Sequence, residues 1–581
     1  MFVPYKTQLR RSWKTHFPAR TQLAVSVTTE WNYRQHLFAW ATLLLTTLVV
    51  LLPNLSYPLI EPDETRYAQI AIEMNTSHEW VTPTLDGLPY LDKPPLLYWL
   101  TAATFQILGV NETAARLPSM LAALATILLT FGWGARIVGQ RPAWLAAITL
   151  TLSGGFILAG RFLILDSLLT LFTTASLLSG YIAVRGQCHR PTWWMVAGIA
   201  CALGVLTKGP VAFVLCAPPL VVSGWLRADE SRTRVWHWIA FVLPMVVFCV
   251  PWYAAVAKFN PHFVDYFFWE HNFQRFMRGS NHEQPLWFYI PIVFAAMFPS
   301  SLLLPSVGVF LASRADRIRS LRSEDVGFLC CAAIWALAFF SAASCKLPTY
   351  ILPVIPLLCL IMGVMLDQTV FRLGATDRIT NYLRPFPQRA NLIMTACGLV
   401  SVSIDIWIGN RLSVASIAAS TGCVLVLATT TWRWNGEAAF GRTAWATTAA
   451  ISTCVLLFVS SALLPTISTE RSAFVEIQRV ADATPDAWIV FFGEKPHGSA
   501  FHLSNYRTTF FPKELEEEFV VFVERLEDLI LVTDDERIVQ TRQRLAGTHL
   551  LTESPNHEHV YRASRVQHPV AEVARVDTVN R

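Results

Sequence analysis

Long apolar runs separated by short polar connections dominate this 581-residue chain. A membrane-spanning helix needs about 20 mainly apolar residues, and the pattern predicts thirteen such helices. Their ranges are 37–53, 117–135, 142–160, 167–184, 192–207, 209–226, 236–257, 286–312, 326–343, 350–366, 391–409, 413–431 and 443–465. We therefore expect an all-α polytopic membrane protein.

The apolar segment 96–109 is too short for its role to follow from length. It is either a short span or a helix lying in the membrane interface. Arginine and lysine concentrate in cytoplasmic connections, and the arginine-bearing connections all fall on the side of the N-terminus if this segment does not cross. We therefore predict an interfacial helix here and a cytoplasmic, basic N-terminal segment at 1–36.

With thirteen spans, everything after residue 465 lies on the outer face. The composition changes there, and the apolar runs 487–493, 517–523 and 528–532 are predicted as buried strands. Thr533 and Glu536 have the spacing of a capping box that would begin a helix. We expect a small α/β domain over 466–565 on the outer surface, followed by a disordered tail at 566–581.

The composition supports the membrane assignment, with 53% hydrophobic and 15% charged residues, against about a quarter charged in ordinary soluble domains. The net charge is +5, and no run of Lys and Arg is dense enough to indicate nucleic-acid binding. The 11 cysteines lie mostly inside apolar stretches, without a CxxC motif. Cysteine behaves there as a small apolar residue, so no disulfide or cysteine–metal site is predicted.

Residues that could bind a substrate or take part in catalysis are concentrated in four connections, which this topology places on the outer membrane face. These connections are 54–116, 161–166, 258–285 and 344–350. In the first, Asp63 and Glu64 begin a predicted helix, where acidic residues are also favoured by the helix dipole. Lys93 precedes two prolines at the membrane boundary, where lysines also commonly extend towards water. Each feature alone therefore has a structural as well as a functional explanation.

The other three connections add further charged and aromatic residues, namely Arg161, Asp166, His271, Arg275, Lys346 and Tyr350. Phosphate binding needs cations together with hydrogen-bond donors. Group transfer needs a carboxylate that acts as a base or stabilises a developing positive charge. Cations and carboxylates on one membrane face therefore predict an enzyme that handles a phosphate-bearing substrate.

Three motifs carry a family resemblance: EPDETRYAQIAIEM (61–74), WVTPTLDGLPYLDKPPLLYWL (80–100) and NETAARLPS (111–119). Together they strongly resemble the lipid A aminoarabinose transferases. These belong to the GT-C class of membrane glycosyltransferases, which includes the protein O-mannosyltransferases. The resemblance implies 13 spans, an outward active site, an undecaprenyl-phosphate-linked sugar donor, and inversion of the anomeric centre in a single displacement.

The resemblance also assigns roles residue by residue. It implies that Asp63 is the catalytic carboxylate, with Glu64 adjacent and Asp166 as a second acid. The carrier phosphate would be bound by Lys93, Arg275 and Tyr350, with Tyr90 and Lys346 as further candidates. Asp92 and His271 match a family position that holds a divalent metal, although family members often have Glu in place of Asp92.

Two other function classes are weighed against an enzyme. A transporter or flippase places its ionisable groups near the midplane on broken helices, whereas here they lie in connections and Asp405 is the one notable charge within a span. A scaffold leaves the set of Asp63, Lys93, Asp166 and Arg275 unexplained. We therefore predict an inner-membrane glycosyltransferase whose acceptor is lipid A, another glycan or a protein Ser/Thr.

Overall fold

The computed structural model describes most of the chain. The described ranges are 31–185, 191–226, 233–277, 283–314, 316–371, 378–383, 385–394, 441–493, 497–503, 505–533, 549–553 and 560–565, with a few isolated positions besides. The predicted spans 391–409 and 413–431 fall almost wholly outside these ranges. So do the tail at 566–581 and most of the helix that Thr533 was predicted to begin.

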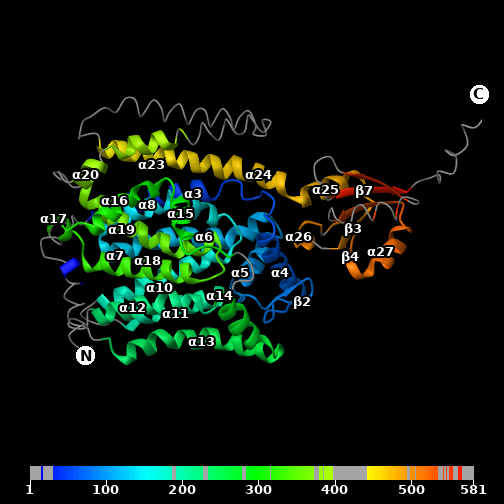
Figure 1. Ribbon diagram of the computed structural model, residues 1–581, viewed down its shortest axis with the longest axis horizontal. Coiled ribbons are helices and arrows are strands. Elements are labelled where there is room, and N and C mark those ends of the chain that lie inside the picture. The colour runs from blue at the N-terminus through cyan, green and yellow to red at the C-terminus, as the bar shows by residue number, and fades with distance from the viewer. Residues whose placement is uncertain are drawn as a thin grey trace, which may run out of the picture.

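Helices form the main body, and most of the long ones run along the long axis of the molecule (Figure 1). They are α3 (Tyr33–Leu51), α6 (Glu112–Gly132), α7 (Gly134–Val138), α8 (Gln140–Thr151), α9 (Gly154–Gly160), α10 (Leu165–Arg185), α11 (Pro191–Lys208), α12 (Val211–Leu226), α13 (Val235–Phe259), α15 (Tyr289–Ala296), α16 (Leu304–Ala312), α18 (Glu324–Ala342), α19 (Ile355–Thr369) and α23 (Gly441–Phe458). Short pieces flank them: η2 (Ser300–Leu303), α17 (Asp316–Arg319), α20 (Arg378–Leu383) and η5 (Val459–Leu463).

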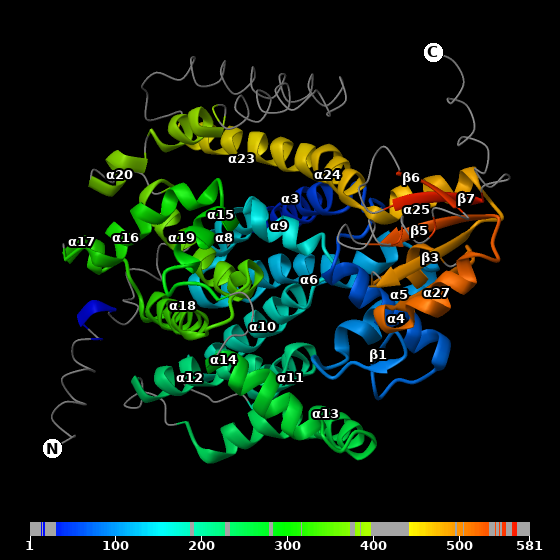
Figure 2. The same ribbon diagram turned by 45° about the vertical axis from the view of Figure 1, so that its right-hand side comes forward.

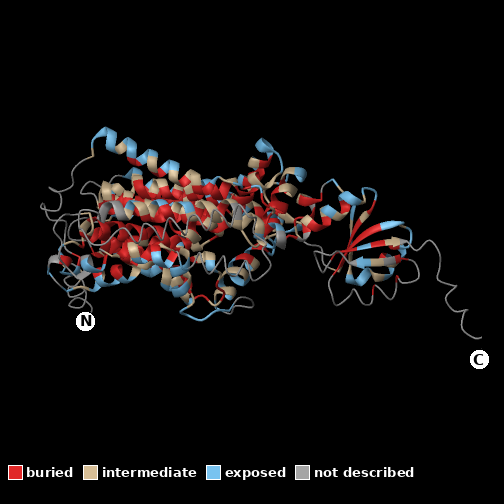
Figure 3. Ribbon diagram, turned by 90° about the horizontal axis from the view of Figure 1, so that it is seen from above, coloured by how far each residue is buried: buried red, intermediate tan, exposed pale blue. Residues whose placement is uncertain are grey.

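Within the described residues, seven helices are long and apolar enough to cross a membrane, or up to nine if each of two bent pairs counts as one span. The chain is therefore a multi-pass membrane protein, and the total of thirteen spans stays a prediction. Buried residues fill the middle of the bundle (Figure 3). Apolar residues on the outer helix α13, such as Leu243 and Val247, are exposed, as expected of a surface that faces lipid.

Two segments predicted as continuous spans, 142–160 and 286–312, are broken. Helices α8 and α9 meet at 70°, and α15 meets the segment that contains α16 at 114°. The two breaks pack together, because the Gly154 amide donates a hydrogen bond to the Phe298 carbonyl at 2.9 Å. Backbone groups freed by a break in a membrane need an internal partner, and each break supplies the partner of the other.

At one end of the bundle lie α4 (Asp63–Ser77), the hairpin of β1 (Thr84–Leu85) and β2 (Leu88–Pro89), and α5 (Leu96–Leu108). The helix predicted from Asp63 is confirmed, with its apolar face of Tyr67, Ile70, Ala71 and Met74 buried. The segment 96–109 is a helix, and its placement in the interface stays a prediction. Nearby are η1 (Asp265–Gln274), α14 (Arg275–Met277) and η3 (Pro348–Val354).

The C-terminal part contains a five-stranded sheet in the order β4-β3-β5-β7-β6. Strands β3 (Trp488–Gly493), β4 (Thr508–Pro512) and β5 (Asp528–Thr533) are parallel, whereas β7 (Val560–Arg565) pairs antiparallel with β5 and with β6 (His549–Glu553). The strands predicted at 487–493 and 528–532 are confirmed. Helices α24 (Leu464–Arg471) and α25 (Ala473–Ala483) lead into the sheet, and α26 (Ser499–His502) follows β3 (Figure 2).

The third predicted strand, 517–523, is wrong. This segment is helix α27 (Glu516–Val523), preceded by the short η6 (Lys513–Leu515). Three glutamates occupy its first turn, where the helix dipole favours negative charge. Phe519 and Val523 then share one buried face at a helical spacing of four. Side chains alternate along β3, so that Val490 and Phe492 pack with α27 while Ile489 and Phe491 pack with α25.

We expect Gly363→Ala to destabilise the bundle, because α19 packs directly against the backbone of α8 at this glycine. A Cβ at residue 363 would lie 2.1 Å from the Pro142 carbonyl oxygen and 2.9 Å from the Ala146 nitrogen. Overpacking of this kind costs about 1–3 kcal/mol, which thermal unfolding in detergent would detect as a lower midpoint. The control is Gly308→Ala on α16, where a Cβ meets nothing within 4 Å. Equal midpoints for the two variants would contradict this packing.

Candidate active site

Lys208, Asp166, Thr349 and Tyr350 form a polar cluster near the end of the bundle that carries α4 and α5, with Asp166 buried and the other three residues partly buried. The Lys208 ammonium, at the last residue of α11, lies 2.5 Å from Asp166 Oδ1. Thr349 Oγ1 donates a hydrogen bond to Asp166 Oδ2 at 2.9 Å. Lys208 Nζ also lies 3.7 Å from the centre of the Tyr350 ring, where the ring electrons attract a cation. Asp166 thus holds Lys208 in place.

The backbone after Lys208 explains how η1 reaches this cluster. Gly209 has a φ of +82°, and a Cβ there would lie 2.9 Å from the Phe267 ring. Glycine adopts a positive φ without steric cost, so the chain turns directly after Lys208 and leaves room for Phe267. The turn therefore ends α11 at the lysine and lets η1, which carries His271, pack beside it.

His271 links this region to the connection that carries Lys93. His271 Nε2 lies 2.7 Å from Lys93 Nζ, and its Nδ1 lies 3.8 Å from Asp92 Oδ1. Burial, followed by the charge of Lys93, lowers the pKa of His271 to about 3. The imidazole is therefore neutral at physiological pH, and its Nε2 can accept a hydrogen bond from the Lys93 amine.

Burial, together with the positive charges of Lys208 and Arg275, lowers the pKa of Lys93 to about 7 against the opposing effect of Asp92 and Asp166. Three cations thus repel one another across a confined space. A pKa depressed by burial and by like charges is a common feature of functional sites. An anion bound among the three cations would relieve this repulsion.

The predicted metal position does not fit a divalent cation in this arrangement. Tyr266 donates a hydrogen bond to Asp92 Oδ1 at 2.5 Å, while the ammonium of Lys93 occupies the Nε2 side of His271. Both candidate ligands therefore have protein partners, and the nearby positive charge opposes a second cation. Among the described residues, no group of three or more His, Cys, Asp or Glu side chains gathers around a common point.

Asp63 is the accessible carboxylate of the site. It is the first residue of α4, its side chain is 50% exposed, and it lies 3.6 Å from Arg66 one turn further on. An exposed pair of this kind is weak, so the carboxylate remains free to meet a substrate. Its negative charge also acts on Lys208, so Asp63 lies near the cation cluster formed by Lys93, Lys208 and Arg275.

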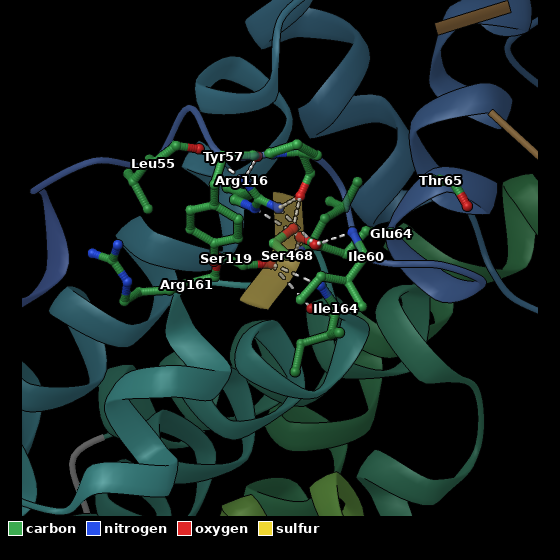
Figure 4. A network of polar contacts seen from close by, with 12 residues as sticks. Leu55, Tyr57, Ile60, Glu64, Thr65, Arg116, Ser119, Arg161, Ile164 and Ser468 are labelled. Carbon is green, nitrogen blue, oxygen red and sulfur yellow. Dashed lines mark hydrogen bonds and ion pairs between the residues drawn. The ribbon is translucent and has the colours of Figure 1, made fainter. Parts of the chain in front are cut away.

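Glu64 is held differently from its neighbour (Figure 4). Its side chain is only 3% exposed, and Arg116 of α6 contacts both carboxylate oxygens, through Nε at 2.9 Å and Nη2 at 2.7 Å. The backbone amides of Ile60 and Leu163 donate to the same carboxylate at 2.8 and 2.7 Å. Four donors thus engage Glu64, and this geometry suits a positioning role better than a proton transfer.

Arg116 also fixes the segment that leads into α4. Its guanidinium donates to the carbonyls of Leu55, Tyr57 and Pro58 at 2.5 to 3.0 Å and stacks on the Tyr57 ring at 3.7 Å. Arg161 is likewise buried against backbone carbonyls, those of Val50, Leu51, Pro53, Asn54 and Ser460. Both arginines therefore anchor backbone around the site.

Lys346 and Tyr90, the further phosphate candidates, have different surroundings. Lys346 is buried and donates to the Gln284 carbonyl at 2.7 Å, so it ties two connections together. Tyr90 packs edge-on against Tyr98 with ring centres 6.4 Å apart. Burial raises the pKa of Tyr90, which keeps its hydroxyl protonated as a hydrogen-bond donor near Lys93.

Lys208 is the functional candidate that the sequence analysis missed. It lies between the predicted spans 192–207 and 209–226, where a single lysine at a span end is an ordinary feature. The Gly-Pro pair that follows it was a signal for a sharp turn. Only the folded chain shows that this lysine turns inward to Asp166, which lies 42 residues earlier.

The sequence is similar to known glycosyltransferases. The family model described as dolichyl-phosphate-mannose-protein mannosyltransferase matches residues 37–267. The undecaprenyl phosphate-alpha-4-amino-4-deoxy-L-arabinose arabinosyl transferase 2 of Pseudomonas fluorescens is 34% identical over 375 residues, which are 62% of this chain and 61% of that protein. The corresponding transferase of Edwardsiella ictaluri is 30% identical over 369 residues, or 64% of its length. The aligned part thus spans about three fifths of these relatives.

The fold extends the similarity over nearly the whole chain. The crystal structure of ArnT from Cupriavidus metallidurans bound to undecaprenyl phosphate has a TM-score of 0.70 at 24% identity and covers 92% of this chain and 99% of that one. The apo structure of the same protein gives a TM-score of 0.69. The resemblance to the aminoarabinose transferases and the predicted fold class are therefore confirmed.

We expect Arg116→Met to be severely destabilising, because it leaves the Glu64 carboxylate buried without its counter-charge. Breaking a buried ion pair in this way costs about 3–5 kcal/mol, which denaturant or thermal unfolding in detergent would show. Adding Glu64→Gln removes the unpaired charge and should recover part of the loss. A double variant that loses the sum of both single effects would contradict the pairing.

Proposed function

We propose that this protein transfers a sugar from an undecaprenyl-phosphate-linked donor to a lipid A-type or other glycan acceptor, at the outer face of the inner membrane. The observation that carries the proposal is the convergence of Lys93, Lys208 and Arg275 together with the accessible carboxylate of Asp63, whose charge acts on Lys208. The activities for which the aligned relatives are named, and the carrier lipid bound in the ArnT structure, support the same donor.

The cations have two tasks in this proposal. They bind the phosphodiester of the donor, to which Tyr350 and Tyr90 add hydroxyl donors. When the bond between the anomeric carbon and the phosphate oxygen breaks, its electron pair stays on the phosphate, which gains one negative charge. Positive groups fixed in advance around that oxygen stabilise the charge as it develops.

Asp63 acts on the acceptor. An acceptor hydroxyl loses its proton to the Asp63 carboxylate while its oxygen forms a bond to the anomeric carbon from the side opposite the phosphate, which inverts that centre. An acceptor that is already a phosphate anion needs only orientation by Asp63. Asp166 serves indirectly, because it holds Lys208 at 2.5 Å. Glu64 fixes the helix turn that carries Asp63.

The proposed topology follows the charge pattern. Residues 1–36 face the cytoplasm, 37–465 form the transmembrane glycosyltransferase domain with the outer connection 54–116, and 466–565 form a periplasmic domain. The match to the mannosyltransferase family model over 37–267 favours a protein Ser/Thr acceptor as the second candidate. A panel that offers both lipid A and a Ser/Thr peptide to the same preparation distinguishes the two.

We expect Asp63→Asn to abolish sugar transfer while donor binding persists. Loss of a general base lowers the rate by about 10²–10⁴-fold, measured as release of undecaprenyl phosphate from a panel of undecaprenyl-phosphate sugars by purified protein in lipid. Asp265→Asn, which changes an exposed acid on η1, is the matched control. Full transfer activity in the Asp63 variant would refute its assigned role.

The pKa of Lys93, about 7 in the free protein, predicts pH-dependent donor binding. A bound phosphodiester raises this pKa, so binding above pH 7 takes up a proton and affinity falls by up to about tenfold per pH unit. Calorimetry with undecaprenyl methyl phosphate, a phosphodiester whose charge stays constant, would measure the proton uptake. Lys93→Arg stays charged and should lose the pH dependence. Equal profiles for both proteins would contradict this role of Lys93.

A further inference from the structure

The C-terminal domain touches both elements that carry the proposed site. Helix α26 packs against α4, which begins with Asp63 (Figure 1). Phe501 of α26 lies 6.1 Å, between ring centres, from Phe105 of α5 and joins the same apolar cluster. His497 Nδ1 lies 3.3 Å from Asp86 Oδ2 in the turn between β1 and β2. The domain thus contacts the whole connection from α4 to α5.

A further contact falls on the first turn of α4. Gly498, directly before α26, has a φ of +92°, and a Cβ there would lie 2.7 Å from Thr65 Cβ and 3.1 Å from Thr65 Cγ2. Glycine is required here both for its backbone conformation and for this close approach. Thr65 is buried two residues after Asp63. The domain therefore packs directly against the turn that carries the proposed catalytic carboxylate.

The N-terminus of α4 has no side-chain cap, because Pro62 occupies the N-cap position and no side-chain hydrogen bond caps the helix. Glu64 anchors the turn to Arg116 and to the backbone of Ile60 and Leu163. Contacts from the C-terminal part add to this anchor at a helix end that has no cap. Ser468 of α24 adds a second restraint by donating to the Pro58 carbonyl at 2.6 Å. The C-terminal part thus contacts both the first turn of α4 and the segment that leads into it.

Hydrogen bonds tie the rest of the connection to α4. The Glu73 carboxylate accepts hydrogen bonds from Thr84 Oγ1, the Asp86 amide and the Gly87 amide at 2.7 to 3.2 Å. Asn75 donates to the Ala102 carbonyl of α5 at 3.0 Å. These hydrogen bonds therefore link the three places that the C-terminal domain contacts, at Thr65, Asp86 and Phe105.

We propose that the C-terminal α/β domain positions Asp63 for catalysis by clamping the first turn of α4 through the contact between Gly498 and Thr65. The inference rests on the proposed function, because the role of Asp63 does. Gly498 and Thr65 are positioning residues that act through Asp63. A displacement of about 1 Å at a reacting group costs up to about 10²-fold in rate, so a small shift of this turn has a large effect.

The test is a double-mutant cycle in the full-length protein in lipid. Gly498→Ala places a methyl group against Thr65, and we expect kcat to fall by about 10- to 100-fold while the affinity for undecaprenyl phosphate changes little. Thr65→Gly removes the atoms that this methyl meets, so the double variant should turn over faster than Gly498→Ala alone. Backbone strain at residue 498 is common to both and cancels in the cycle. Gly308→Ala is the control for a glycine replaced in open space.

Hydrogen exchange supplies a readout independent of turnover. Amides of residues 63–77 should exchange faster in Gly498→Ala, while those of 165–185 in α10 keep the wild-type rate. Unchanged kcat, unchanged exchange in α4, or independent effects of the two substitutions would each overturn the inference. Wild-type protein that releases no carrier lipid from any donor would overturn the proposed function instead, and the exchange data would still decide whether the domain holds α4.

Discussion

The buried pair of Glu64 and Arg116 is the interaction on which the architecture of the site depends. It joins the start of α4 to α6, and through its remaining hydrogen bonds Arg116 also fixes the segment from Leu55 to Pro58. Charges removed from water are stable only when their partners satisfy them fully, and here both side chains are satisfied. The neighbouring Asp63 can therefore stay exposed on a turn that is itself anchored.

In the cation cluster of Lys93, Lys208 and Arg275, by contrast, the charges are only partly compensated by neighbouring carboxylates. Burial and the nearby charges of Lys208 and Arg275 lower the pKa of Lys93 to about 7, and Asp166 with Asp92 opposes only part of this effect. A site with surplus positive charge favours an anion of defined position. The same surplus stabilises a phosphate that leaves with an extra negative charge. Binding and catalysis in the proposed reaction therefore draw on one electrostatic feature.

Sequence alone determined the features that depend on residues near one another in the chain. Apolar runs of spanning length identified the membrane helices, because the bilayer sets their length. The helix beginning at Asp63 and two of the strands followed from local periodicity. The motifs of 61–74, 80–100 and 111–119 led to the right family resemblance, and with it to Asp63, Lys93 and Arg275 as candidates. Their catalytic and binding roles remain predictions.

Only the tertiary structure decided which side chains meet. Lys208 pairs with Asp166, 42 positions away in the sequence. Lys346 donates to the Gln284 carbonyl, 62 positions away. The bends after α8 and α15 arise because each break satisfies the backbone of the other. Residues 517–523 form a helix because Phe519 and Val523 pack on the sheet, although an apolar run this short fits a strand equally well. Partners distant in sequence settle such choices, and local patterns do not encode them.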